Sequence, residues 1–267
     1  MEKQIIDSLK APQTIIFFAG LVAFSVWLVP LIFRKVTTNT TFEKASWDIS
    51  DFFVSICIFF TIIGIAQFFI DAETTKNKFV LIVLNAIFQL CTCCLLCLWL
   101  RKIKKSTWSS LGIAKISLKR ALYSITAYIV FLPSFLVISV LSFIIITKLG
   151  YTPEKQEIVK FFTETHGTKL LISAGLAIIF IPIFEEFFFR AFLYSWLRSV
   201  VGVPTAIIIS ALCFSAVHGS LAGFIPIATL GALFALLYEK TQIIWIPILI
   251  HSLHNFFTIL LVVQGIG

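Results

Sequence analysis

Long apolar runs separated by short polar segments dominate the chain. The runs lie at residues 12–33, 52–70, 79–100, 121–147, 170–197, 203–220, 221–238 and 243–263. A helix needs about 20 mostly apolar residues to cross the hydrocarbon core of a bilayer, so each run predicts a membrane-spanning helix. The pattern therefore predicts an all-α protein, a polytopic transmembrane helical bundle of about eight spans, of which the sixth and seventh are short.

Composition excludes several other classes of protein. Of the 267 residues, 59% are hydrophobic and 13% are charged, whereas a soluble domain carries roughly 25% charged residues. These values exclude a disordered chain and a soluble globular domain, and the apolar runs are too long for the alternating strands of a membrane barrel. We attribute the net charge of +8 to basic residues on one side of a membrane, so the expected partner is a lipid bilayer and not a nucleic acid.

The orientation in the membrane follows from one short basic segment, residues 101–120. It contains seven Lys and Arg residues and no acidic residue: Arg101, Lys102, Lys104, Lys105, Lys115, Lys119 and Arg120. Basic residues in short loops are enriched on the cytoplasmic side, so we expect this loop to be cytoplasmic. The abundance of Ile, Phe and Lys further points to an integral protein of a bacterial cell membrane.

Ionisable side chains inside the apolar runs occur only in the second half of the chain. Before residue 169 the runs contain no Asp, Glu, Lys, Arg or His, whereas the later runs contain several. A charge at the bilayer centre costs about 2.5–3.5 kcal/mol on insertion scales, and such residues usually mark function. We therefore interpret residues 1–168 as a transmembrane scaffold of four spans and residues 169–267 as a functional core of about four spans.

Helical spacing assigns different surroundings to two adjacent glutamates. Glu186 and Arg190 lie four residues apart, share one helix face and are expected to form an ion pair. Glu185 is rotated by about 100° from Glu186, so it can face a different neighbour and remain free. On the last run His251 and Asn255 also lie four residues apart and are expected to share a face.

Three predicted helices thus each offer one polar face, formed by Glu185, by His218, and by His251 with Asn255. If the faces meet, they form an intramembrane cavity in which a buried carboxylate can take a proton from water. Asn or His can then donate a hydrogen bond to a developing oxyanion. Glu185, His218 and His251 would also suit zinc, so metal-free and metal-assisted hydrolysis both remain open.

Three motifs occur in order in this half: EExxxR from Glu185 to Arg190, FxxxH from Phe214 to His218, and HxxxN from His251 to Asn255. In this order and spacing they resemble the CAAX protease and bacteriocin-processing (CPBP) family, the type II CAAX prenyl endopeptidase-like intramembrane proteases. The resemblance covers about residues 169–263 and marks 169–267 as a catalytic core of this kind.

The resemblance implies an eight-helix fold with a site recessed in the membrane. It implies that Glu185 activates the attacking water with His218, and that His251 and Asn255 complete the site and stabilise the oxyanion. The remaining positions would support the site, with the role of His254 as an extra ligand or proton carrier left open: Glu186, Arg190, Phe214 and His254.

We therefore expect an intramembrane endopeptidase that acts on a membrane-associated or prenylated, CAAX-like peptide. The first alternative is a non-catalytic membrane regulator or a bacteriocin-immunity-type protein with the same fold. The second is a proton-coupled transporter, in which buried Glu and His residues relay protons. Transporters usually contain repeated halves, and the sequence shows no such repeat, which counts against this alternative.

Two local features add structural expectations. Pro182, three residues before Glu185, removes a backbone donor and should loosen the helix there. The segment 151–162 has the pattern of a short amphipathic helix on the outer surface, with a solvated loop or a lid as the alternatives.

Overall fold

The structure is a computed structural model that describes residues 43–67, 77–151 and 157–265, together with the isolated Gly20, Ala23 and Leu28. The first predicted span, residues 12–33, therefore falls almost wholly outside the described residues. Within the described ranges all regular structure is helical. This agrees with the all-α prediction.

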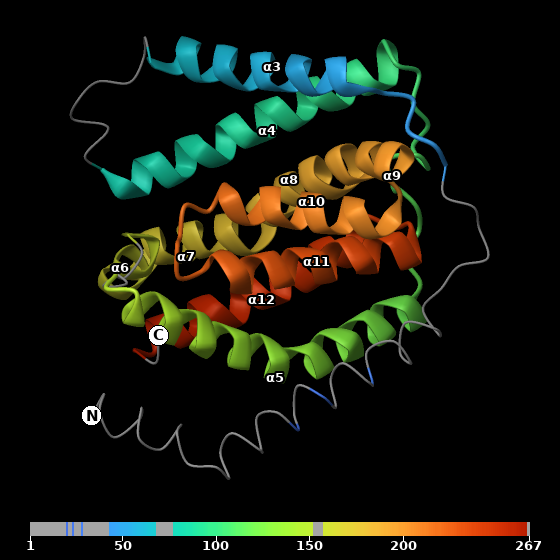
Figure 1. The fold of residues 1–267 in the computed structure, drawn as a ribbon. Coiled ribbons are helices and arrows are strands. Elements are labelled where there is room, and N and C mark those ends of the chain that lie inside the picture. The colour runs from blue at the N-terminus through green and yellow to red at the C-terminus, as the bar shows by residue number, and fades with distance from the viewer. Residues whose placement is uncertain are drawn as a thin grey trace.

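The helices form three groups, which Figure 1 shows as roughly parallel layers. A hairpin of α3 (Ile49–Gln67) and α4 (Lys78–Lys102) lies along one edge, and α5 (Leu118–Lys148) lies along the opposite edge. Between them lie a continuous helical run and three further helices. Their bounds are α7 (Gly167–Gly175), η2 (Leu176–Phe180), α8 (Ile181–Glu186), η3 (Phe187–Tyr194), α9 (Ser195–Val201), α10 (Val203–Ala216), α11 (Phe224–Thr241) and α12 (Trp245–Val263).

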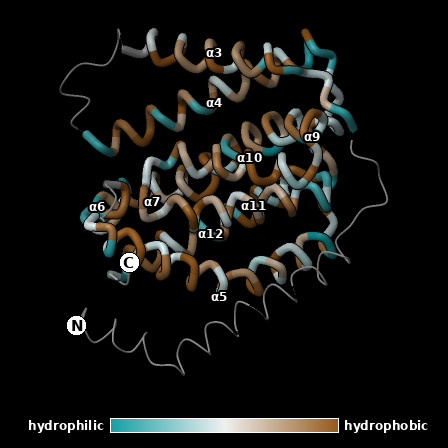
Figure 2. Tube along the Cα trace, viewed as in Figure 1, coloured by the Kyte–Doolittle hydropathy of each residue, from teal (hydrophilic) through white to brown (hydrophobic). Residues whose placement is uncertain are grey.

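Five helical segments of the described part are long and apolar enough to cross a membrane. They are Lys78–Lys102, Leu118–Lys148, Gly167–Val201, Phe224–Thr241 and Trp245–Val263. Two shorter apolar segments, Ile49–Ile65 and Val203–Ala216, accompany them. Figure 2 shows hydrophobic positions through most of these helices, with hydrophilic ones gathered near the ends of α3 and α5. The chain is a polytopic helical membrane protein with five candidate spans in its described part, fewer than the eight expected from the apolar runs.

At the sixth and seventh apolar runs the observed helices differ from the predicted spans, and the cause is local. Helix α10 ends at Ala216 and α11 begins at Phe224, so the run that predicted a helix to residue 220 instead enters a turn. Ser142 Oγ of α5 donates to the carbonyl of Ala222 at 2.7 Å. Ser142 lies six residues before the end of α5, about 9 Å of helix rise. The turn after α10 is therefore recessed below the end of α5.

The run from Gly167 to Val201 contains two π-helical segments, η2 and η3. In the first, the N–H of Ile181 donates to the carbonyl of Leu176, five residues earlier. The same register would pair the carbonyl of Ala177 with residue 182, which is a proline and has no N–H. The loosening expected at Pro182 is thus present as a wide helical turn. In this turn the carbonyl of Ala177 has no backbone donor and can accept a hydrogen bond from a side chain.

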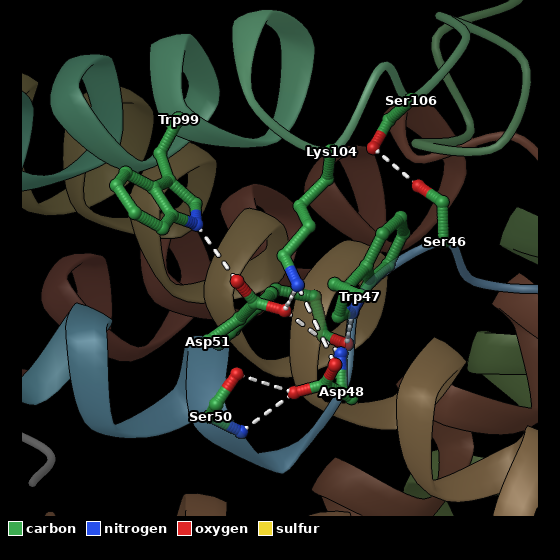
Figure 3. Close-up of polar contacts among 9 residues, drawn as sticks. Ser46, Trp47, Asp48, Ser50, Asp51, Trp99, Lys104 and Ser106 are labelled. Atoms are coloured by element: carbon green, nitrogen blue, oxygen red, sulfur yellow. Dashed lines mark hydrogen bonds and ion pairs between the residues drawn. The ribbon is translucent and has the colours of Figure 1, made fainter.

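A buried carboxylate holds the α3–α4 hairpin together at one end (Figure 3). Asp51, in the first turn of α3, accepts a hydrogen bond of 2.8 Å from the Trp99 indole and lies 2.8 Å from Lys104 Nζ. The N–H of Asp48 also donates to Asp51, at 2.9 Å. The ammonium of Lys104 donates a hydrogen bond to Asp51, and this bond raises the pKa of Lys104. We call Asp51, Trp99 and Lys104 the Asp51 clamp.

A tryptophan next to the Asp51 clamp joins the hairpin to the central helices. The indole N–H of Trp47 donates to the carbonyl of Phe192 in η3 at 3.0 Å, and the two rings stack with centroids 6.2 Å apart. Trp47 is 3% exposed. Residues close to the EExxxR motif are therefore anchored to the N-terminal part of the chain.

The basic segment between α4 and α5 also packs on the core. Gly112 has a φ of +73°, and a Cβ at this position would lie 2.6 Å from Tyr238 Cε2. The Gly112 carbonyl accepts from the N–H of Ile244 at 2.9 Å. A residue without a side chain is needed here, because only glycine combines this φ with so close an approach.

A short helix was expected in residues 151–162, and α6 is described from Glu157 to Glu164. Its Phe161 and Phe162 are buried and pack in one cluster with Val262 of α12. The helix therefore covers the end of α12 by apolar contact, as an amphipathic surface helix does.

Candidate active site

The ion pair between Glu186 and Arg190 forms the buried centre of the site. Neither side chain is exposed to any extent. Arg190 Nη1 donates to Glu186 Oε1 at 3.1 Å, and Nε lies 3.1 Å from Oε2 without the alignment of a hydrogen bond. Nη2 donates to the carbonyl of Gly231 on α11 at 3.0 Å. The guanidinium therefore ties the EExxxR helix to α11 while it neutralises Glu186.

Two aromatic rings enclose this guanidinium. Its carbon lies 4.4 Å from the ring centroid of Phe214 and 5.2 Å from that of Phe234, so both rings contribute cation–π attraction. A Cβ on Gly231 would lie 3.0 Å from Phe214 Cδ1 and 3.3 Å from Ala211 Cα. Glycine therefore permits the close approach of α10 and α11. The motifs do not contain Phe234 or Gly231, although a glycine inside an apolar span is a signal of close helix packing.

His251 connects the two glutamates. Its Nδ1 lies 2.8 Å from Glu186 Oε1, and its Nε2 lies 3.7 Å from Glu185 Oε2. Its ring stacks on Phe234 with centroids 4.9 Å apart. Because Glu186 is paired with Arg190, we assign the Nδ1 proton to the bond with Glu186, which leaves Nε2 facing Glu185. Two acceptors that face each other at this distance need a shared proton or a water molecule between them.

Glu185 is the carboxylate without a fixed partner. Its side chain is 16% exposed, and its buried Oε2 has no hydrogen-bond partner among the described residues. It interacts electrostatically with His251 and His218. It also lines a cavity of about 500 Å³. The rotation of Glu185 away from Glu186, expected from helix geometry, is therefore present in the structure.

His218 lies in the turn after α10 rather than on the helix itself. Its Nδ1 is 2.7 Å from the carbonyl of Phe214, so we assign the ring proton to this bond and leave Nε2 as an acceptor. The ring is 4.8 Å from that of Phe214, centroid to centroid. The residue is exposed, and its neighbour Val217 lines the same cavity as Glu185. The FxxxH spacing thus works through a backbone contact and not through a shared helix face.

Asn255 completes the wide turn before Pro182. Its Nδ2 donates to the carbonyl of Ala177 at 2.9 Å, the carbonyl that the proline leaves without a backbone donor. One of the two amide hydrogens of Asn255 therefore stabilises the EExxxR helix. The second hydrogen is not committed by this bond.

His254 contacts α5 and not the two glutamates. Its Nδ1 lies 3.1 Å from the hydroxyl of Tyr128, and its ring meets Phe135 edge-on with centroids 5.0 Å apart. Both partners belong to α5. The structure thus brings Glu185, Glu186 and His251 together and directs His254 to a contact between α12 and α5.

The cavity beside Glu185 is bounded by both halves of the chain. Residues of α3, α4, α8, η3 and the turn after α10 line it: Ser55, Ile56, Phe59, Phe60, Asn85, Gln89, Thr92, Phe184, Glu185, Phe188, Phe189 and Val217. The contribution of α4 was not predicted, because its apolar run contains no Asp, Glu, Lys, Arg or His. The amides Asn85 and Gln89, four residues apart, were the available signal.

The described side chains, as they are placed, do not form a metal site. Among the described residues, no group of three or more His, Cys, Asp and Glu side chains could hold a metal ion. The set of Glu185, His218 and His251 that would suit zinc is therefore not arranged as a ligand group. We derive no step through a metal.

Comparison with known proteins gives the family of this site. Residues 167–257 match the family described as type II CAAX prenyl endopeptidase Rce1-like. Over 85 residues the chain is 32% identical to the protein named "Putative membrane peptidase YdiL" of Bacillus subtilis strain 168. That alignment covers 32% of this chain and 35% of the relative, about a third of each. No solved structure matches. The matched segment contains all three motifs and the ion pair described above, so residues 167–257 are similar to the Rce1-like type II CAAX prenyl endopeptidase family.

Proposed function

We propose that the protein is an intramembrane endopeptidase that hydrolyses a peptide bond in a membrane-associated or lipidated peptide. The observation that carries this proposal is the position of Glu185. It is a largely buried carboxylate with an unpartnered oxygen at the wall of a cavity, 3.7 Å from His251 Nε2. A carboxylate in such a position can act as a general base toward water.

In the proposed reaction Glu185 takes a proton from water while the water oxygen bonds to the scissile carbonyl carbon. The carbon–nitrogen bond then breaks, and the proton passes to the departing amine. His218 Nε2, left free by the bond to Phe214, helps to orient the water. The uncommitted amide hydrogen of Asn255 donates to the oxyanion, and His251 donates to it from Nε2 when that nitrogen holds the proton shared with Glu185.

The buried pair of Glu186 and Arg190 acts in this proposal by positioning. Glu186 holds Nδ1 of His251 at 2.8 Å and so directs Nε2 toward Glu185. Arg190 neutralises Glu186, so Glu186 does not compete with Glu185 for the proton that is taken from water. Phe214 and Phe234 exclude water from the ion pair, which keeps its electrostatic effect strong.

The same proposal assigns the setting of the reaction. The relative from Bacillus subtilis is named as a membrane peptidase, and we propose a bacterial cell membrane, with residues 101–120 on the cytoplasmic side because they are basic. We further propose that residues 1–168 serve as the scaffold and residues 169–267 as the catalytic core.

The test is peptide cleavage by the purified protein in nanodiscs. Wild type, Glu185→Gln and His218→Ala are offered prenylated CAAX peptides and a mixed pool of apolar membrane peptides, with and without a zinc chelator. Loss of the base should lower cleavage about 10²- to 10⁴-fold. Glu164→Gln, an exposed site on α6, is the matched control and should cleave as wild type does.

Each result assigns a function. Cleavage that disappears in Glu185→Gln while the protein stays folded supports the peptidase, and the chelator samples decide whether a metal takes part. A folded wild type that cleaves neither substrate set contradicts the proposal in favour of a non-catalytic regulator or immunity-type protein. Proton movement across vesicles that Glu185→Gln abolishes would instead favour a transporter.

A further inference from the structure

The cavity beside Glu185 has a neutral polar side that the proposed chemistry does not use. Asn85 and Gln89 of α4 both line it. Two lining hydroxyls are already committed to their own helices: Thr92 Oγ1 donates to Phe88 and Ser55 Oγ donates to Phe52. The hydrogen-bonding capacity that remains on this side therefore belongs to the two amides.

Gln89 shows that this capacity is unfilled. Its Oε1 is buried, and it has no hydrogen-bond partner among the described residues. A buried acceptor left without a donor is unfavourable, because it has lost its bonds to water and gained none in return. In a membrane helix such a group normally faces a bundle interior or a water-filled cavity, where a partner can reach it. We therefore expect Gln89 Oε1 to accept a hydrogen bond from an N–H group of a bound molecule.

The spacing of the two amides matches an extended peptide. Asn85 and Gln89 are four residues apart on one helix face, which is about 6 Å along α4. In an extended chain, groups that point the same way recur every second residue, about 6.6 Å apart. One amide can therefore bind the main chain at one residue of an extended segment, while the other binds it two residues further on.

The walls of the cavity define the side chains that would fit. They are largely aromatic, with Phe59 and Phe60 from α3 facing Phe184 and Phe188 from the other half. Glu185 is the one charged residue among the described residues that line the cavity. Apolar side chains would be accepted, whereas an acidic side chain would meet the like charge of Glu185.

We propose that Asn85 and Gln89 bind the main chain of an extended, uncharged, apolar peptide segment and so position its scissile bond at Glu185. This inference rests on the proposed peptidase function for its last step, but binding by the amides can be measured without turnover. The α3–α4 hairpin would then be the side of the site that selects an extended substrate, and the two amides would be positioning residues.

The experiment measures peptide binding to the Glu185→Gln protein in nanodiscs. The probe is a fluorescent, acetylated and amidated repeat peptide of Val and Ala. The comparison peptide has the same side chains but an ester oxygen in place of every second main-chain N–H. One edge of this extended peptide therefore has no hydrogen-bond donors. Removal of a neutral hydrogen bond should weaken binding about threefold to tenfold, measured as the ratio of the Kd of the ester to that of the amide peptide.

Substitutions in the Glu185→Gln protein test whether residues of α4 cause the difference in Kd between the ester and the amide peptide. In Glu185→Gln with Gln89→Met the ratio should fall to about one, because the acceptor is gone, and Asn85→Leu should lower it as well. The matched control is Gln264→Met, which removes an exposed amide at the end of α12 and should leave the ratio unchanged. If Gln89→Met fails to fold, Asn85→Leu supplies the same comparison.

A ratio that stays at the parent value in Gln89→Met and in Asn85→Leu would overturn the inference. A ratio of one already in the parent would do so as well. These outcomes are separate from failure of the proposed function, which would appear as undiminished cleavage by Glu185→Gln. A second readout uses any peptide that wild type cleaves: Gln89→Met should raise KM with little change in kcat if the amide binds substrate and transition state equally.

Discussion

The two sides of the cavity are built from different chemistry. On the side of α8 and η3, ionisable residues are buried in a dense network with α11 and α12, in which Glu186, Arg190 and His251 each have assigned partners. On the side of α3 and α4, the lining contains neutral amides and hydroxyls among aromatic rings. The difference indicates that one side is built for proton chemistry and the other for binding and selecting a peptide.

The attachment of the two sides also differs. The central helices are held to one another by bonds from the buried ion pair, because Arg190 donates to the Gly231 carbonyl of α11 and Glu186 binds His251 of α12. The hairpin is held at one end by the Asp51 clamp and by the bond from Trp47 to the carbonyl of Phe192. A substrate-binding wall can tolerate small movements, whereas the relative positions of base and imidazole must be fixed to permit catalysis.

The largest expected effect on stability comes from Arg190. Arg190→Met leaves Glu186 as a buried charge without its cation, and this should lower the free energy of unfolding by about 3–5 kcal/mol. Thermal unfolding in detergent measures the change. The comparison is Arg198→Met, which breaks the partly exposed pair with Glu239 and should cost about 1 kcal/mol or less. Equal losses in the two variants would show that the buried pair has no special importance.

A smaller effect is expected at Asn255. Asn255→Leu removes the donor to the carbonyl of Ala177 and should cost about 1–3 kcal/mol. Pro182→Ala restores a backbone N–H in the same turn, so the cost of Asn255→Leu should be smaller in that background. A double-mutant cycle of unfolding free energies measures this coupling. Strictly additive losses would contradict the pairing of the proline and the asparagine across the two helices.

The smallest effect is expected in the hairpin. Asp51→Asn removes the charge opposite Lys104 but keeps an oxygen for the Trp99 indole, so it should cost about 1 kcal/mol, since Lys104 is partly exposed. Hydrogen exchange should become faster in α3 and α4 and stay unchanged in α10 to α12. Uniformly faster exchange would show that the Asp51 clamp stabilises the whole bundle and not the hairpin alone.

Much of the second half could be predicted from the sequence because its signals are local. Helical spacing was enough to place Glu186 beside Arg190 and to turn Glu185 away from both. The three motifs indicated a resemblance to the family that residues 167–257 match. The assigned roles of the individual residues remain predictions.

Other features depend on contacts between distant segments and had no such signal. The end of α10 at Ala216 could not be read from an apolar run that continues to residue 220. The bond from Asn255 to Ala177 depends on a π-helical register, which no sequence period marks. Phe234 stacks on His251 only because α11 packs beside α12, and the approach of α4 to Glu185 likewise requires the tertiary fold.

The most direct test compares the two adjacent glutamates. Glu185→Gln and Glu186→Gln make the same chemical change one residue apart, and both cleavage and the unfolding temperature are measured for each. Glu185→Gln should lose cleavage about 10²- to 10⁴-fold and keep the unfolding temperature of wild type. Glu186→Gln should unfold at a lower temperature, because Arg190 is then buried without a counter-charge. Wild-type cleavage by Glu185→Gln, or equal stability of the two variants, would contradict the division of roles between the free and the paired glutamate.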